Sequence, residues 1–304
     1  MNRAYGINRG ALDRPGVKFR AIPAPESGTN VPSDHIVATL AADSIGSVVE
    51  AARDCVRERS VIATSDKYRD SSFCRYDWSS TLTAWDRPGY WTPEYSIKDL
   101  AERISSRIDS TTESDSLEST IEFDVTGQYL DIGRVLTGEP ECWGSLEAAP
   151  VRQEVVRVVL NMACSYGVHA RALAIRGAAV AALIDRLQRE YIVELELVSV
   201  VSKSTGMGFS HLVKIAVDLD NEYGMQQLEF ALLHAGFYRR LVFALREYVE
   251  GKDDLGNYGT PGDLKAAGDV YYFGPMRSSS DGFDSIDEAI DTVNRMLAER
   301  RNAQ

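Results

Sequence analysis

The sequence contains few cysteines and histidines, and this scarcity argues against one common class of metal site. The 304-residue chain has 4 Cys and 4 His. No two cysteines form a Cys-x-x-Cys pair, and the histidines are not spaced as ligands of one ion. We therefore expect no zinc site. Scattered, unpaired cysteines favour a reducing compartment, so we expect the protein to be cytoplasmic.

Other patterns are also missing. No apolar run approaches the roughly 18 residues of a membrane-spanning helix. The first residues lack the apolar segment of a secretory signal, so we expect none. Lys and Arg number 33 against 45 Asp and Glu, and the resulting net charge of −12 argues against a nucleic-acid partner. No Gly-x-Ser-x-Gly motif, phosphate loop or His–Cys arrangement supplies a nucleophile, which favours a protein that is not an enzyme.

The apolar pattern of residues 120–202 predicts the fold class. We expect strands at 121–124, 155–164 and 192–201, with a helix at 169–190 before the last strand. A strand that is apolar on both faces belongs inside a covered sheet, usually a parallel one. Strand–helix–strand segments of this length are right-handed crossover units. The sequence therefore predicts an α/β fold, with a mainly parallel sheet sandwiched by helices.

Composition also predicts how the chain is divided. Residues 1–40 are rich in Pro and Gly, and we expect an extended arm. Residues 41–117 should form a helical extension that includes an aromatic loop at 68–95, and 118–304 the α/β domain. The Ser-, Thr- and acid-rich stretch 109–119 is the predicted boundary between the last two parts.

Further helices and strands follow from spacing and capping signals. Helical periodicity predicts a helix at 44–59 and another that begins after Ser96. A helical stretch at 225–250 should be interrupted near Gly236, which leaves a dibasic turn at 238–240. Strands are predicted at 213–217 and 270–273, and a capping box from Ser285 should open the last helix.

Polar side chains after the 121–124 strand form the predicted binding site. Open α/β sheets place their sites at the carboxyl ends of strands, so this loop is the first candidate. The dibasic turn is the second. The side chains that we expect to contact a partner are Asp131, Arg134, Glu139, Glu141, Trp143, Arg239 and Arg240. For Arg176, within the 169–190 helix, we expect a surface or capping role.

The order strand, Asp-Val-Thr-Gly-Gln, strand, helix, strand resembles a von Willebrand factor A domain. The resemblance implies a divalent ion such as Mg²⁺ at the carboxyl edge of the sheet. Asp124 and Thr126 match the first Asp and first hydroxyl of the family's motif, and Asp218 matches its later aspartate. Gln128 stands where the motif has a second serine. Carboxylate, hydroxyl and water oxygens are suitable ligands for Mg²⁺, whereas Gln128 departs from the family's motif.

The same segment also resembles a family of bacteriophage and bacterial proteins. In microbial proteins of the von Willebrand A type, a frequent partner is a MoxR-type AAA+ ATPase. These resemblances imply a phage-encoded, non-enzymatic module that binds another protein with the help of a divalent metal.

Two alternatives remain open. The N-terminal arm could join neighbouring copies in a virion or another assembly. Alternatively, the acids could hold Mg²⁺ for hydrolysis of a phosphoester. The acids concerned are Asp124, Asp131, Glu139, Glu141 and Asp218.

Overall fold

The computed structural model describes the chain in two compact units. Met1–Ile108 together with Val155–Gln304 form the larger unit, and Asp109–Glu154 form the smaller one. The described residues are 13–21, 35–58, 76–87, 89–108, 120–124, 129–130, 141, 143–147, 154–165, 167–202, 209–217, 219, 224–250, 261–264, 270–278 and 281–303.

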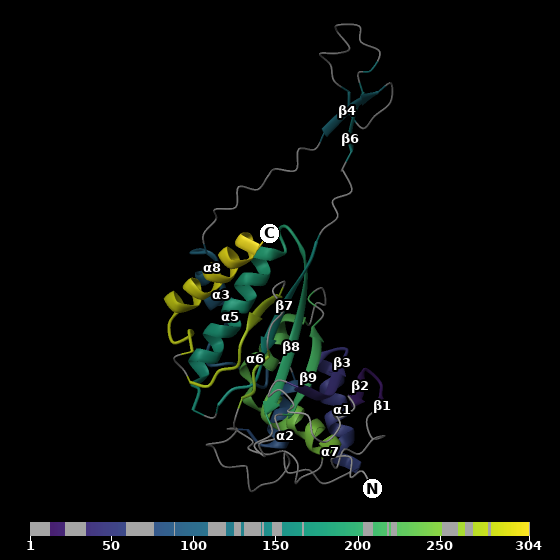
Figure 1. Cartoon of the computed structure of the whole chain (residues 1–304), viewed down its shortest axis with the longest axis vertical. Coiled ribbons are helices and arrows are strands. Elements are labelled where there is room, and N and C mark those ends of the chain that lie inside the picture. The colour runs from purple at the N-terminus through teal and green to yellow at the C-terminus, as the bar shows by residue number, and fades with distance from the viewer. Residues whose placement is uncertain are drawn as a thin grey trace. The chain divides into compact units, whose positions relative to one another are not determined.

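A seven-stranded sheet is the centre of the larger unit (Figure 1). Its order is β1-β2-β3-β9-β8-β7-β10. The strands are β1 (Asp13–Arg14), β2 (Val17–Ala21), β3 (His35–Ala42), β7 (Val155–Asn161), β8 (Ile192–Ser202), β9 (Phe209–Val217) and β10 (Val270–Phe273). The pairs β3–β9, β7–β8 and β7–β10 are parallel, whereas β1–β2, β2–β3 and β8–β9 are antiparallel. The α/β class is confirmed, and the sheet is mixed.

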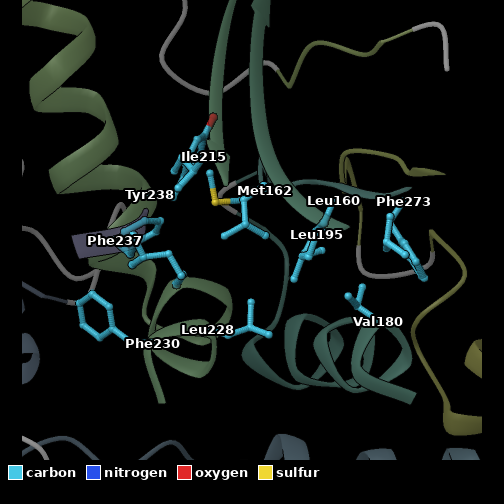
Figure 2. Close-up of a cluster of buried hydrophobic side chains, with 14 of the residues drawn as sticks. Leu160, Met162, Val180, Leu195, Ile215, Leu228, Phe230, Phe237, Tyr238 and Phe273 are labelled. Atoms are coloured by element: carbon cyan, nitrogen blue, oxygen red, sulfur yellow. The ribbon is translucent and has the colours of Figure 1, made fainter. Parts of the chain in front are cut away.

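The helices of the larger unit share one hydrophobic core with one face of this sheet. They are α1 (Ile45–Glu58), α2 (Trp78–Asp86), α3 (Ile97–Ser105), α5 (Ala170–Leu187), α6 (Gly224–Leu233), the π-helical turn η3 (Phe237–Val242), α7 (Phe243–Glu250) and α8 (Ile286–Ala303). Helices α3, α5 and α8 contact one another (Figure 1). Leu160 and Leu195 of the sheet lie on the side that faces Val180 of α5 (Figure 2).

The opposite face of the sheet is covered differently. Its buried cluster consists of Val159, Val198 and Val200, packed against Leu264 and residues of β10. Within the described residues this cluster contains no helical residue. In the first half of β8, acidic residues alternate with the apolar ones. Glu196 of this face bonds to Lys214 of β9 at 3.2 Å.

The first strand of the predicted α/β core belongs elsewhere. β4 (Thr120–Asp124) pairs with β6 (Trp143–Glu147), which also pairs with β5 (Tyr129–Leu130). These antiparallel strands form a separate sheet in the smaller unit. The predicted domain 118–304 is therefore wrong at its N-terminal boundary. Its first strand pairs with β6, which follows the polar loop, and not with the strands of the main sheet.

The N-terminal prediction also needs correction. Within residues 1–40, β2 and most of β3 are strands of the main sheet rather than an extended arm. Val17 and Leu40 are buried in the common core, and this burial holds both strands in the sheet.

Several local predictions are confirmed. Ser96 Oγ accepts the N–H of Asp99 at 3.2 Å and caps α3. Ser285 Oγ accepts the N–H of Glu288 at 3.2 Å, as the capping-box pattern requires. The predicted aromatic loop, by contrast, contains α2, which Asp77 caps by accepting the N–H of Ser80 at 2.6 Å. None of the described helices combines the length and apolar content needed to cross a bilayer.

Candidate functional site

The carboxyl ends of β7, β8 and β10 lie at one edge of the sheet because these strands are parallel. Asn161, at the end of β7, is fully buried there. Its Nδ2 donates to the carbonyl of Gly262 at 3.0 Å and to Tyr272 Oη at 3.1 Å. Its Oδ1 accepts the N–H of Ala163 at 3.1 Å. This side chain holds the 261–264 segment against the sheet.

Arg176 completes the same edge from α5. Its side chain is buried, and Nη1 donates to the carbonyls of Asn161 at 3.1 Å and Gly274 at 3.2 Å. Burial lowers the pKa of Arg176 to about 10. The predicted surface or capping role is therefore wrong, because carbonyl groups at the strand ends accept the hydrogen bonds of the buried guanidinium group.

The phenol of Tyr272 links this network to the surface. Its hydroxyl donates to Asp263 Oδ1 at 2.7 Å. Burial, the largest cause, raises the pKa of Tyr272 to about 12, so the phenol remains protonated at neutral pH. The polar groups that meet at this edge bond to one another, and this edge is a structural latch rather than an open site.

A more open site lies between the end of α2, the segment 89–93 and the first turns of α6. It is a cavity of about 480 Å³, within the size range of ligand sites. We call it the aromatic cavity. Its described lining residues are Ala84, Trp85, Asp86, Gly89, Trp91, Pro93, Gln226, Gln227, Glu229 and Phe230.

Three aromatic rings shape the wall of this cavity. Phe230 of α6 lies 5.5 Å from the Trp85 ring and 6.1 Å, edge to face, from the Trp91 ring. Trp91 Nε1 donates to Tyr76 Oη at 3.2 Å, which fixes the orientation of the indole. The turn before Trp91 is possible because Gly89 has a φ of +89°, a conformation that glycine tolerates best.

His234 supports the wall from behind. Its ring stacks between Tyr76, at 4.0 Å, and Phe230, at 4.8 Å. His234 is 1% exposed, and its Nδ1 accepts the N–H of Gly236 at 3.2 Å. This bond places the proton of the neutral ring on Nε2. Burial lowers the pKa of His234 to about 4, so the ring is neutral near pH 7.

The charged groups of the cavity are carboxylates. Glu229 Oε1 accepts the N–H of Ile97 at 3.3 Å, and no ion pair among the described residues includes Glu229. Asp86 at the end of α2 forms an ion pair with Arg53 of α1. The described lining contains no Lys, Arg or His. The site therefore combines aromatic surface with negative charge.

The predicted metal ligands belong to two separate units of the chain. Asp124 ends β4 in the smaller unit, whereas Asp218 follows β9 in the larger one. Thr126, Gln128 and Asp218 lie outside the described residues, and so does the side chain of Asp124. Within the described part of the chain, no group of three or more His, Cys, Asp or Glu residues is placed to hold a metal ion. The Mg²⁺ site stays a prediction.

The predicted partner contacts fall into two groups. Asp131, Arg134 and Glu139 lie outside the described residues, while Glu141 is exposed and Trp143 begins β6.

Arg239 and Arg240 form the second group. Both lie within η3, where they are 8% and 1% exposed. Arg240 Nε donates to the carbonyl of Tyr76 at 3.1 Å. The predicted dibasic turn is wrong because the helix is interrupted only at His234, resumes at Ala235 and carries both arginines into the core.

The aromatic cavity was not predicted. Phe230, His234 and Phe237 recur at helical spacing and all lie on the buried side of the α6–η3 segment. This spacing can be read from the sequence. The contact of that helix face with Trp85 and Trp91 cannot be predicted in the same way, because more than 130 residues separate the two segments.

One family model matches the chain over residues 38–301, and its description is Domain of unknown function (DUF7192). The chain belongs to the DUF7192 family. The DUF7192 match begins within β3, ends near the close of α8 and includes all the described residues that line the aromatic cavity. No curated protein and no solved structure matches the chain.

Proposed function

We propose that this protein is a non-enzymatic, protein-binding module whose contact site is the aromatic cavity. The observation that carries the proposal is the cavity itself, with two indoles and a phenyl ring in its lining. Tyr90, between two lining residues, is 62% exposed. Trp and Tyr are enriched in protein interfaces and dominate their binding energy.

The frame around the cavity supports this function because it is fixed before a partner arrives. The Arg53–Asp86 ion pair joins α2 to α1. The Glu229 bond to the N–H of Ile97 joins α6 to α3. A site that is already ordered loses less conformational entropy on binding, so more of the contact energy appears as affinity.

The hydrolase alternative has less support. It needs Asp124 and Asp218 at one sheet edge, and Asp218 lies outside the described residues. The carboxyl edge of the main sheet is instead filled by the Asn161 and Arg176 network.

A von Willebrand A-like fold for the larger unit also remains a proposal. It is supported by the β7–α5–β8 unit and by the antiparallel neighbour β9. The proposed divalent ion is tested by thermal melts with and without Mg²⁺ on wild type and Asp124→Ala. A stabilisation that the variant loses supports a metal ligand at this position, and equal melts in both proteins refute it.

The binding proposal is tested by selecting peptides from a random displayed library on the full-length protein. We expect enriched peptides whose affinity falls at least tenfold, about 1.4 kcal/mol, in Trp91→Ala. Tyr191→Ala, at a half-buried position that does not line the cavity, is the matched control and should bind as wild type does. Circular dichroism verifies that both variants are folded.

The contrary results are equally clear. Enrichment no greater than on an unrelated acidic protein would contradict the proposal. So would enriched peptides that bind Trp91→Ala as tightly as wild type.

A further inference from the structure

We infer that the aromatic cavity receives the cationic end of a Lys or Arg side chain from a partner protein. This inference rests on the proposed function and names the chemistry of the contact.

The charge of the cavity is the first reason. Glu229 and Asp86 line it, and the described lining contains no cationic side chain. Asp86 is already paired with Arg53, so Glu229 is the main counter-charge for an incoming ligand. Among the described residues, Glu229 accepts one hydrogen bond, from the N–H of Ile97 to Oε1 at 3.3 Å. The second carboxylate oxygen remains for an ammonium or guanidinium group.

The aromatic lining is the second reason. An ammonium or guanidinium group is attracted to the face of an indole or phenyl ring, and Trp is the strongest partner. Trp85, Trp91 and Phe230 supply such rings beside Glu229. An anionic side chain would meet the carboxylates and the negative faces of these rings, so the same lining disfavours it.

The net charge of the whole chain also favours a positively charged ligand. Its net charge of −12 attracts a basic partner over longer distances and raises the rate of encounter. The cavity volume of about 480 Å³ accommodates a long side chain together with its flanking backbone.

The test uses five synthetic peptides that differ at one central position, which is Lys, Arg, Gln, norleucine or Glu. Binding to the full-length protein is followed by tryptophan fluorescence, because two of its four Trp line the cavity. We expect the Lys and Arg peptides to bind at least tenfold more tightly than the others. Raising the salt concentration should weaken only these two.

Protein variants then locate the charge. Glu229→Gln keeps the size of the side chain and should weaken the Lys peptide about tenfold, a change of about 1.4 kcal/mol. Glu102→Gln removes the same charge from an exposed position on α3 and should have no effect. Gln226→Lys adds a positive charge at an exposed lining position, without altering the core, and should abolish the preference for Lys and Arg.

Two results separate this inference from the proposed function. If library-selected peptides bind through Trp91 but the Gln or norleucine peptide equals the Lys peptide, the cation inference fails and the binding function stands. If neither library-selected nor synthetic peptides bind, both fail. A Lys preference that survives unchanged in Glu229→Gln also overturns the assignment.

Discussion

Acidification should destabilise the protein through His234. The histidine pKa is about 6.5 in an unfolded chain, and burial lowers it to about 4 in the folded protein. Below pH 6.5 the unfolded chain binds a proton that the folded protein binds only near pH 4. The free energy of unfolding therefore falls as the pH falls through this window, and the effect is absent above it.

The magnitude follows from the size of the shift. One pKa unit corresponds to about 1.4 kcal/mol, so a shift from 6.5 to about 4 removes about 3 kcal/mol over the whole window. Between pH 7.5 and pH 5.0 the loss from this site is about 2 kcal/mol. The ring stack of Tyr76, Phe230 and Trp91 supplies no charge that would stabilise the imidazolium.

The assay is urea unfolding at a series of pH values, compared between wild type and His234→Asn. The Asn side chain retains an acceptor for the N–H of Gly236 but does not titrate. Its stability should therefore lack the His234 contribution, and the difference between the two proteins should shrink by about 2 kcal/mol from pH 7.5 to 5.0. A difference that stays constant with pH would refute the reasoning, and so would an NMR titration that gives His234 a pKa near 6.5.

Three further substitutions test the packing. Asn161→Ala leaves the Gly262 carbonyl without this donor and should lower the free energy of unfolding in urea by about 2–4 kcal/mol; a loss below 1 kcal/mol would contradict the latch. Gly236→Ala places a methyl group 2.2 Å from Thr81 Oγ1 and should cost about 1–3 kcal/mol, with partial rescue by Thr81→Ala. Gly177→Ala places its methyl group 3.0 Å from Ile97 Cδ1, the end of a flexible side chain. It should therefore lower the free energy of unfolding less than Gly236→Ala does in the same assay.

The local elements could be predicted because their signals are local. Ser96 and Ser285 stand before apolar residues at helical spacing, and each accepts the expected backbone N–H. The apolar runs of β7 and β10 likewise identify these segments as strands, whichever strands they pair with. Such signals depend on a few neighbouring residues, and distant packing did not override them.

The pairing of strands could not be predicted with the same success. The segment that ends at Asp124 has the residue pattern of a strand, and it is a strand. Nothing in its five residues, however, distinguishes pairing with β6 from pairing with β7. Its assignment decided where the metal ligands were expected. The predicted metal site therefore depends on a strand whose partner the sequence alone does not identify.

The buried arginines show a second limit. Arg176, Arg239 and Arg240 stand in apolar helices, where charge suggests the surface. Arg176 and Arg240 are buried because carbonyl groups from other segments accept their hydrogen bonds. Sequence spacing along one helix does not reveal such distant acceptors.

The central claim concerns where a partner binds, and ¹⁹F NMR of 5-fluorotryptophan-labelled protein tests it most directly. Four resonances, for Trp78, Trp85, Trp91 and Trp143, can be assigned by single Trp→Phe variants. On addition of the Lys peptide, the resonances of Trp85 and Trp91 should shift with one common dissociation constant, while Trp143 should stay unchanged. Shifts confined to Trp143, or saturation with no change at Trp85 and Trp91, would contradict the account.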